Sequence, residues 1–392
     1  MRNFIAFALT ILLTYSPFTS YAQTVAEIID AMETANDHFI AKYPDAGAPT
    51  FVKKERPSNL WTRGVYFEGL YALADLERMT GGEKADTYYN YICAWGAAHN
   101  WTPRNGVTTR DADDYCCCQT YLDMGHDEAT IKCMDNLIAS RTTPWTPGGN
   151  EKSKGSIGDW TWIDAIQMGL PVMSKLSAMK QRQGDKDYLR YAEQGWMMYK
   201  ASRDSLGGGF FNPKDNLWWR DADFVAPFKT PNGKECYWSR GNGWVYAALV
   251  RAMDALPSDP HYKDYLSDFK KMSAALLKCQ QPDGYWYASL HDANDFGGKE
   301  LTGTALFIYG MAWGVRNGYL SESQYKPIIL TTWQNMVKDC LHPDGFLGYV
   351  QGTGKEPKDS QPTTYDKEPD FDDYGLGCFL LCGTEIVKLI SK

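Results

Sequence analysis

The feature that most constrains the fold is an amphipathic helix pattern that returns six times, each time after a loop rich in Gly, Asp, Trp or Arg. The clearest copy runs from Val245 to Leu256, with apolar residues at i, i+3, i+4, i+7, i+8 and i+11, and a Gly-Asn-Gly turn at 241–243 is expected to open it. The other copies are predicted to begin near Val65, Tyr115, Ile163, Thr304 and Leu376. Second helices such as 188–200 and 262–278 lie between them. The pattern therefore predicts six helical hairpins.

Six hairpins closed into a ring form an (α/α)6 barrel, so the expected fold class is all-α. The inner helices of such a barrel run in one direction, which gathers the six loops at one rim as a concave site. Helix capping explains the Gly, Asp and Asn of the loops equally well. It does not explain the tryptophans in or beside them: Trp61, Trp95, Trp160, Trp162, Trp218, Trp219, Trp238, Trp244 and Trp286.

The first 22 residues have the pattern of a signal peptide. Arg2 provides the positive start, an apolar run follows from Phe4 to about Leu13, and small residues at 20–22 mark the cleavage site. Residues 23–392 are then expected to form a single (α/α)6-barrel domain. No later apolar stretch is long enough to span a membrane, and no Cys follows the cleavage site to carry a lipid. We expect a protein that is periplasmic or secreted and makes no membrane contact after cleavage.

Composition narrows the class of partner. The chain has 40 Lys and Arg against 48 Asp and Glu, a net charge of -8, and so lacks the basic field that binds nucleic acid. Its 14 Trp and 25 Tyr offer flat faces that stack on sugars. The ten Cys show neither CxxC pairs nor zinc-type spacing, so we expect mostly buried free thiols. The run at 116–118 is interpreted as small apolar residues at a crowded helix position.

Two carboxylates stand out among those in the loops. Asp164 follows two tryptophans at the start of an apolar helix, where desolvation favours a protonated carboxyl. Asp113 begins another inner helix, so the two carboxylates could face each other across the rim and share a proton. Each could instead be an ordinary helix cap. The local cations, which suggest an anionic substrate or else structural ion pairs, are Lys154, Arg220 and Arg240.

At these residues the chain resembles glycoside hydrolase family 105, the unsaturated rhamnogalacturonyl hydrolases, and the related unsaturated glucuronyl hydrolases of family 88. The strongest blocks are YWSRGNGW at 237–244, similar to the family's W-x-R-G-N-G-W, and WID at 162–164, similar to its W-x-D. Supporting blocks are DD at 113–114, QTYL at 119–122, ELTGTA at 300–305, YG at 309–310 and DDYG at 372–375. The resemblance covers nearly the whole mature chain and implies the same (α/α)6 barrel.

The resemblance also implies roles for individual residues. Asp164 corresponds to the family's catalytic carboxylate and Asp113 to its second active-site carboxylate. Arg220 stands where many members carry a histidine, which concerns the uronate and aglycone contacts, and Cys118 stands where a glycine is expected. The expected substrate-binding residues are Lys154, Trp162, Trp219, Arg220, Trp238, Arg240, Trp244, Glu300 and Thr302.

The implied reaction removes a 4,5-unsaturated uronic acid from the non-reducing end of a lyase-generated oligosaccharide, without metal or organic cofactor. Asp164 would protonate C4 of the enol ether and then deprotonate the water that adds at C5. Three alternatives stay open: an inverting (α/α)6 glycosidase acting on saturated glycans, a polysaccharide lyase, and a glycan-binding protein without activity. The sequence does not distinguish galacturonate from glucuronate, and it identifies neither the aglycone nor the oligomeric state.

Overall fold

A computed structural model describes residues 23–51, 55–140 and 159–392. The predicted signal peptide and Lys154 lie outside these residues. In chain order, the helices that line the inside of the barrel are α2 (Trp61–Thr80), α4 (Ala112–Tyr115), α5 (Cys118–Asp123), α7 (Asp164–Arg182), α9 (Ser239–Ala255), α11 (Leu301–Arg316) and α13 (Asp373–Ile390). The helices that surround them are α1 (Val25–Lys42), α3 (Ala85–Ala98), α6 (Glu128–Ala139), α8 (Arg190–Asp204), α10 (Tyr262–Leu277) and α12 (Glu322–Cys340).

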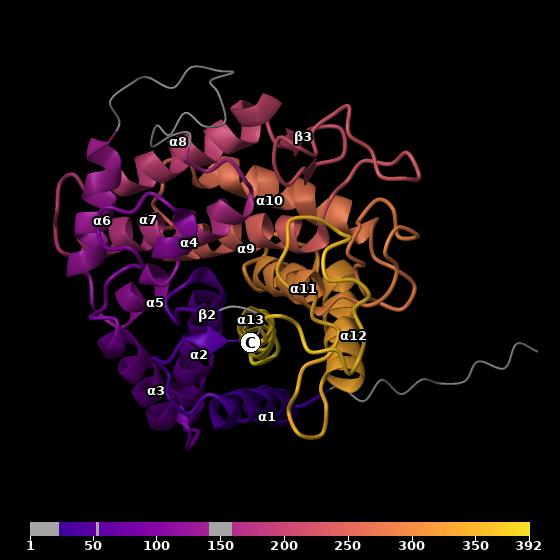
Figure 1. Cartoon of the computed structure of the whole chain (residues 1–392), viewed down its shortest axis with the longest axis horizontal. Helices are drawn as coiled ribbons and strands as arrows, with labels where there is room; N and C mark the ends of the chain where they lie inside the picture. Colours follow the sequence, from indigo (N-terminus) through magenta and orange to yellow (C-terminus); the bar gives the residue numbers. More distant parts are fainter. Residues whose placement is uncertain (1–22, 52–54, 141–158) are drawn as a thin grey trace, which may run out of the picture.

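The two sets form concentric layers. Figure 1 shows α1, α3, α6, α8, α10 and α12 around the outside, with α2, α5, α7, α9, α11 and α13 within them. Strands are confined to two antiparallel pairs in the described residues: β1 (Thr50–Phe51) with β2 (Glu55–Arg56), and β3 (Phe211–Asn212) with β4 (Leu217–Trp218). A single-turn 3-10 helix spans Leu206–Gly208. The predicted all-α (α/α)6 barrel is thereby confirmed.

Burial separates the layers as a double ring requires. Residues 301–315 of α11 are buried on every side, as expected for a helix enclosed by neighbours. In α10, apolar burial follows one stripe that includes Tyr265, Phe269, Met272 and Leu276, and the opposite face is in solvent. An outer helix such as α10 therefore shows a one-sided helical period in its sequence, whereas an enclosed helix such as α11 is apolar on every side.

The ring is closed where α2 meets α13. A Cβ on Gly377 would lie 2.3 Å from the carbonyl oxygen of Val65, so these two helices pack backbone to backbone. Beside this contact Arg63 Nε donates to Asp373 Oδ2 at 3.3 Å, and both side chains are almost fully buried. Burial raises the pKa of Asp373 to about 6, although the Arg63 charge opposes this.

Two expected helix boundaries are corrected. The Gly-Asn-Gly segment lies inside α9, which begins at Ser239, because Asn242 bonds the main chain of Trp218 and a side chain on Gly241 would collide with the Trp238 ring. The inner helix expected near Tyr115 is divided into α4 and α5 at Cys116 and Cys117. The whole Cys run is buried, in agreement with the crowding inferred for it.

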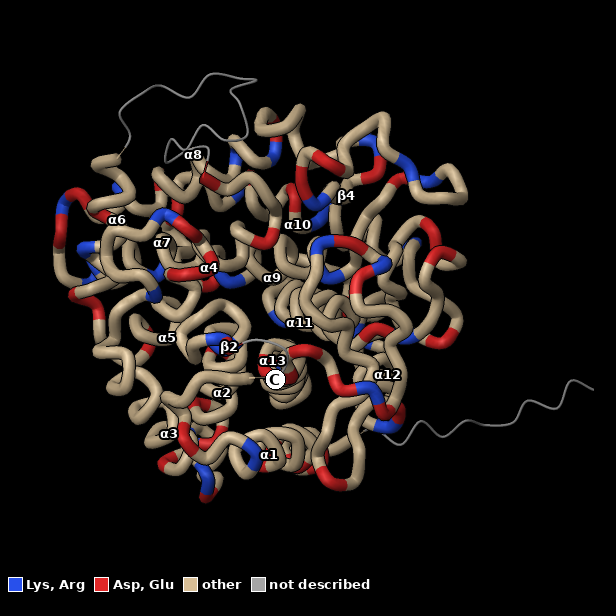
Figure 2. Tube along the Cα trace, viewed as in Figure 1, with Lys and Arg blue, Asp and Glu red and all other residues tan. Residues whose placement is uncertain are grey.

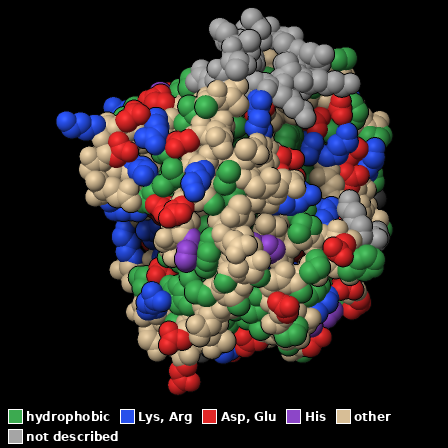
Figure 3. Space-filling model, turned by 60° about the vertical axis from the view of Figure 1, so that its left-hand side comes forward, with side chains coloured by type: hydrophobic (Ala, Val, Ile, Leu, Met, Phe, Trp, Pro, Cys, Tyr) green, Lys and Arg blue, Asp and Glu red, His purple; other side chains and the backbone are tan. Residues whose placement is uncertain are grey.

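The expectation of buried free thiols is also confirmed, since all ten cysteines are unpaired and only Cys93 is exposed. Across the described part of the chain, no helix combines the length and apolar character needed to span a membrane. Figure 3 shows a face on which acidic, basic and apolar side chains are interspersed.

Candidate active site

The inner helices begin at one end of the barrel, which we call the front rim. Three of them carry acidic residues in their first turn, namely Asp113 and Asp114 of α4, Asp164 of α7 and Asp373 of α13. Figure 2 shows the acidic stretch at α4 in red. Helix N-termini favour negative charge, which explains why carboxylates are tolerated there.

Asp164 is the first residue of α7 and is buried. Its segment is held against the chain that follows β4: Ile163 N donates to the carbonyl of Arg220 at 2.9 Å, and Trp162 forms an antiparallel bridge with Asp221. Burial raises the pKa of Asp164, and the charges of Arg220 and Arg240 oppose that rise. The carboxyl of Asp164 is therefore desolvated but still within reach of a cation.

Arg220 links the Asp164 segment to the chain that follows β4. Its Nε donates to Asp164 Oδ2 at 3.2 Å and its Nη1 donates to Asp221 Oδ2 at 2.6 Å. Its Nη2 has no partner among the described residues, so one edge of the guanidinium is available to a ligand. The sequence left open whether Arg220 binds substrate or makes structural ion pairs; the structure contains the ion pairs and leaves the free edge.

Asp113 is partly exposed and receives no cationic hydrogen-bond donor in the described structure. Burial and the charges of Asp111, Asp164 and Asp114 raise the pKa of Asp113 to about 7, whereas the charge of Arg220 lowers it. The charge of Asp164 is therefore one cause of the raised pKa of Asp113, and the sharing of a proton between the two carboxyls stays a prediction. At neutral pH the pair holds one carboxyl that is readily protonated and one that is paired with an arginine.

The neighbouring acidic residues have structural roles. Asp114 is buried and accepts from Arg104 Nη1 at 2.9 Å, Asn105 Nδ2 at 3.0 Å and Thr109 Oγ1 at 2.6 Å. Asp159 forms a two-point contact with Arg110, at 2.9 Å for each nitrogen. These contacts fix the loops on both sides of Asp113 and explain how an acidic cluster of this density is stabilised.

A cavity of about 170 Å³ opens beside the arginine. Trp162 and Arg220 line it together with Asp221 and Asp223, and Phe210 and Gly207 complete its apolar wall. An aromatic ring next to a guanidinium with a free edge is a suitable environment for a sugar acid. Of the predicted substrate-binding residues, Trp162 and Arg220 are therefore the two that border an open space in direct contact with the Asp164 segment.

The other predicted contacts are built into the wall. Arg240 is fully buried, and its two Nη atoms donate to the carbonyls of Gln351 at 2.6 Å and Gly352 at 2.8 Å. Trp238 donates to Gln351 Oε1 at 2.9 Å, so both residues hold the chain between α12 and α13 against the rim. Trp244 is fully buried as well.

Glu300 and Thr302 cap α11. Glu300 Oε1 accepts from Thr302 N at 2.9 Å and from its hydroxyl at 2.6 Å, and Glu300 Oε2 accepts from Gly303 N at 2.7 Å. Trp219 is 8% exposed and donates to Glu235 at 3.1 Å. Contact of these residues with a substrate stays a prediction, and the geometry gives them a supporting position.

Sequence reasoning missed the partners that lie far away in the chain. Gln351, which accepts from Trp238 and Arg240, has no motif around it that marks the role. The one signal that the sequence offered was Glu68, which is a buried acid in the otherwise apolar middle of α2. A charged residue in an enclosed helix needs a partner, so Glu68 indicated a buried polar contact. The described residues contain no group of three or more His, Cys, Asp or Glu that could hold a metal.

Comparison with known proteins places the chain in a family. The sequence profile of glycosyl hydrolase family 88 matches residues 31–390. A protein of Formosa agariphila named unsaturated 3S-rhamnoglycuronyl hydrolase is 28% identical, with 94% of this chain and 92% of that protein aligned. A protein of the same name from an Alteromonas species (strain LOR) is 32% identical over 70% of this chain and 66% of that protein.

Solved structures agree with these matches. A glycosyl hydrolase family 88 protein from Bacteroides vulgatus superposes with a TM-score of 0.76 at 28% identity, covering 94% of this chain and all of that one. A structure described as a polysaccharide lyase has the same TM-score at 25% identity, covering 94% of this chain and 99% of that one. The sequence motifs resemble both family 105 and family 88, and the profile that matches is that of family 88. The chain belongs to glycosyl hydrolase family 88.

Proposed function

We propose that this glycoside hydrolase removes a 4,5-unsaturated uronic acid from the non-reducing end of oligosaccharides left by a polysaccharide lyase. The observation that supports it most is the pairing of Asp164 with Arg220, together with an Asp113 whose pKa is raised to about 7, in a chain whose named relatives are unsaturated rhamnoglycuronyl hydrolases. Burial also raises the pKa of Asp164, and a carboxyl whose protonated form is favoured suits an enol ether, since that group reacts by accepting a proton on carbon.

In this proposal the uronate carboxylate binds the free edge of Arg220, against the ring of Trp162. Asp164 donates a proton to C4, which leaves positive charge at C5 beside the ring oxygen. Water adds at C5 as Asp164 takes a proton from it, and the resulting hemiketal opens and releases the aglycone. Asp113 and Asp164 influence each other's pKa through their charges, and Asp113 orients the water.

Arg220 makes the pKa of Asp164 depend on whether an anionic substrate is bound. In the free enzyme its charge opposes protonation of Asp164. A substrate carboxylate at the guanidinium supplies a competing negative charge, so the pKa of Asp164 rises when the anionic substrate binds. A neutral saturated glycan lacks that charge, which disfavours the alternative of an inverting glycosidase in this site.

The test offers the enzyme lyase digests of pectin, arabinogalactan, glycosaminoglycans and a rhamnose-containing uronan, and follows the ultraviolet absorbance of the conjugated double bond. We expect the absorbance to fall with at least one digest. A second experiment tests the lyase alternative, because one similar structure is described as a polysaccharide lyase. The enzyme is given intact polysaccharide, and a rise in absorbance would identify a lyase. Turnover of saturated oligosaccharides alone would identify a glycosidase, and binding without turnover a glycan-binding protein.

We also propose that the protein is exported, on the signal-peptide pattern of residues 1–22. Fractionation of the producing cells, with N-terminal sequencing of the recovered protein, tests this proposal. A mature protein that begins near residue 23 outside the cytoplasm supports it, and an intact N-terminus on a cytoplasmic protein refutes it.

A further inference from the structure

The middle of the barrel contains a buried carboxylate, Glu68 of α2, whose side chain has no exposed surface. It accepts from Gln167 Nε2 at 3.0 Å and from Cys116 Sγ at 3.5 Å, and it pairs with Arg251 Nη2 at 3.3 Å. We call these four residues the Glu68 cluster. They come from α2, the α4–α5 break, α7 and α9, so one carboxylate joins four parts of the inner ring.

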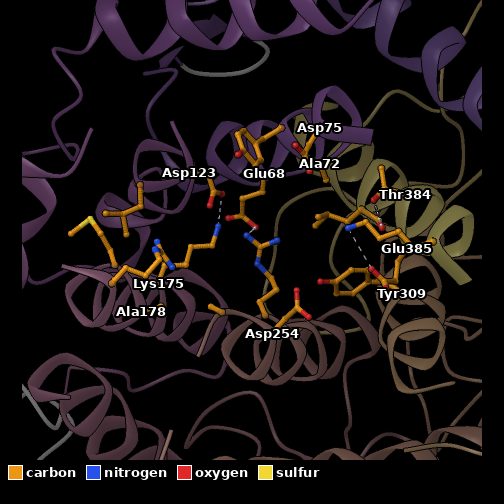
Figure 4. Close-up of a pocket in the computed structure, with 18 residues that line it drawn as sticks. Glu68, Ala72, Asp75, Asp123, Lys175, Ala178, Asp254, Tyr309, Thr384 and Glu385 are labelled. Atoms are coloured by element: carbon orange, nitrogen blue, oxygen red, sulfur yellow. Dashed lines mark hydrogen bonds and ion pairs between the residues drawn. The ribbon is translucent and has the colours of Figure 1, made fainter. Parts of the chain in front are cut away.

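The cluster borders a cavity of about 380 Å³ at the end of the barrel opposite the front rim, which we call the rear cavity. Figure 4 shows Glu68, Lys175 and Tyr309 pointing toward its middle from different helices, with Asp123 beside Lys175. The Glu68 cluster therefore lies between this cavity and the two front-rim carboxyls.

Helix spacing relates the cluster to those carboxyls. Cys116 is three residues after Asp113, and its backbone is still helical at φ −54° and ψ −41°. Gln167 is three residues after Asp164 within α7. Residues three apart lie on one face of a helix. Glu68 thus accepts a hydrogen bond from the residue one turn below each front-rim carboxyl.

This connection matters because α4 cannot hold its own position. It has four residues, too few for an independently stable helix, whereas α7 has 19. A second tie comes from Gln119, whose amide nitrogen donates to the carbonyl of Gln167 at 2.9 Å and whose oxygen accepts from Arg251 Nε at 3.1 Å. The place of Asp113 relative to Asp164 therefore depends on tertiary contacts beneath them.

We propose that Glu68 is a positioning residue, which fixes α4 against α7 and so sets the separation of Asp113 and Asp164. The proposal rests on the function proposed above, in which both carboxyls take part in proton transfer. Misplacement of a reacting group by about 1 Å can cost about 100-fold in rate, so a tie one helical turn away is sufficient to control turnover.

The negative charge of Glu68 is part of the role. A carboxylate accepts at both oxygens, and Glu68 is surrounded by donors from Gln167, Cys116 and Arg251. An amide of the same shape would turn an NH2 group toward one of them and would leave Arg251 less well compensated. Glu68→Gln is therefore a conservative change in shape that breaks the tie.

The test compares Glu68→Gln with Glu385→Gln. Glu385 is a matched control because it is also buried, lines the rear cavity and pairs with an arginine, Arg316 Nε at 2.6 Å, but it joins α11 to α13. We expect both variants to lose thermal stability. Only Glu68→Gln should lower kcat, by about 10-fold to 100-fold, with KM changed less than about 3-fold.

Two further variants keep the test decisive if Glu68→Gln does not fold. Gln167→Met and Cys116→Ala each remove one donor and leave the pair of Glu68 with Arg251 intact. We expect Gln167→Met to lower kcat by about 10-fold and Cys116→Ala by less, since a thiol is a weak donor. Unchanged kcat in Gln167→Met would overturn the proposal.

A pH profile separates positioning from general weakening of the fold. The charged groups acting on Asp113 are Asp111, Asp114, Asp164 and Arg220, and those acting on Glu68 are Arg251, Lys175 and Asp123. We expect the limbs of the kcat/KM profile to move in Glu68→Gln and to stay in place in Glu385→Gln. Equal changes in both variants would overturn the proposal.

Failure of this proposal and failure of the proposed function give different results. Wild-type consumption of unsaturated uronides and its loss in Asp164→Asn test that function. If the wild type acts on another glycoside instead, the same comparison of Glu68→Gln with Glu385→Gln is made on that substrate. A selective loss of kcat in Glu68→Gln there retains the positioning role, and parallel losses remove it.

Discussion

The two ends of the barrel treat their charges differently. At the rear cavity three acids each have a cation of their own: Glu68 pairs with Arg251, Asp123 with Lys175 and Glu385 with Arg316. At the front rim Asp164 and Asp221 share Arg220, and Asp113 has only the more distant charge of that arginine. The carboxylates at the rear cavity are thus individually compensated, whereas those around Arg220 at the front rim depend on one shared cation.

Helix polarity accounts for part of this arrangement. Three inner helices, α4, α7 and α13, begin at the front rim with acidic first turns, and α7 and α11 end at the rear with basic last turns, at Lys180 and Arg182 of α7 and at Arg316 of α11. The dipoles favour ionised carboxylates at the front, yet burial and mutual repulsion raise the pKa of Asp113 to about 7. Carboxyls that remain protonatable at neutral pH are typical of functional sites.

The largest expected effect comes from Asp164→Asn, because an amide cannot transfer the proton. We expect turnover to fall by roughly 1000-fold, about 4 kcal/mol of barrier, with the fold and substrate binding retained. Loss of the conjugated double bond measures the rate, and calorimetry with the unsaturated oligosaccharide measures binding. A variant that kept a tenth of wild-type turnover would deprive Asp164 of the acid/base role.

The next largest effect is expected for Asp113→Asn, with a fall of roughly 100-fold or more in turnover. The limb of the pH profile near pH 7 should disappear, since its titrating carboxyl is gone. The pKa of Asp113 is raised from 3.8 to about 7 on folding, so its ionisation destabilises the folded state increasingly as pH rises through this interval.

The pH dependence of stability gives a second measurement on the same variant. We expect Asp113→Asn to be more stable than the wild type at pH 8 and to lose that advantage near pH 4, where the wild-type carboxyl is protonated in the folded state. Thermal unfolding at both pH values tests it. A near-normal rate with an unchanged pH profile would make Asp113 an ordinary helix residue.

A smaller effect is expected for Arg220→Ala, which removes the shared cation of the front rim. Binding of unsaturated uronides should weaken by roughly 10-fold or more, because the uronate loses a charged donor. The pKa of Asp164 should rise, since Arg220 opposes its protonation. Comparison of kcat/KM on two disaccharides that differ in the uronate or the aglycone measures specificity: unequal losses support a substrate contact, and equal losses or none favour a structural ion pair with Asp221.

The smallest effect on activity is expected at the rear, for Asp123→Asn. Its carboxylate pairs with Lys175, and both side chains are partly exposed. Loss of the pair should lower the free energy of unfolding by about 1 kcal/mol and leave turnover within about 2-fold of the wild type. Chemical denaturation and the absorbance assay measure the two quantities. A fall in turnover comparable to that of Arg220→Ala would remove the distinction between the two ends.

The sequence predicted the helices because their pattern of burial is local. Val245 to Leu256 shows the helical period, and its helix is enclosed as expected. The partners of Arg240 and Glu68 could not be predicted from the sequence, since they are determined by how the ring closes. Arg240 bonds a carbonyl 111 residues away, and Gln167 reaches Glu68 across 99 residues. The start of α9 was misplaced because glycines that permit close helix packing have the composition of a turn.

The closure between α2 and α13 has a consequence for biosynthesis. Arg63 and Asp373 are 310 residues apart, so the first inner helix meets its neighbour on that side only when the C-terminal helix has been synthesised. Non-local contacts of this kind slow folding and leave apolar surface unpaired in the growing chain. Nascent chains of this protein should therefore stay open until α13 has been synthesised, and loss of α13 should leave a ring that cannot close.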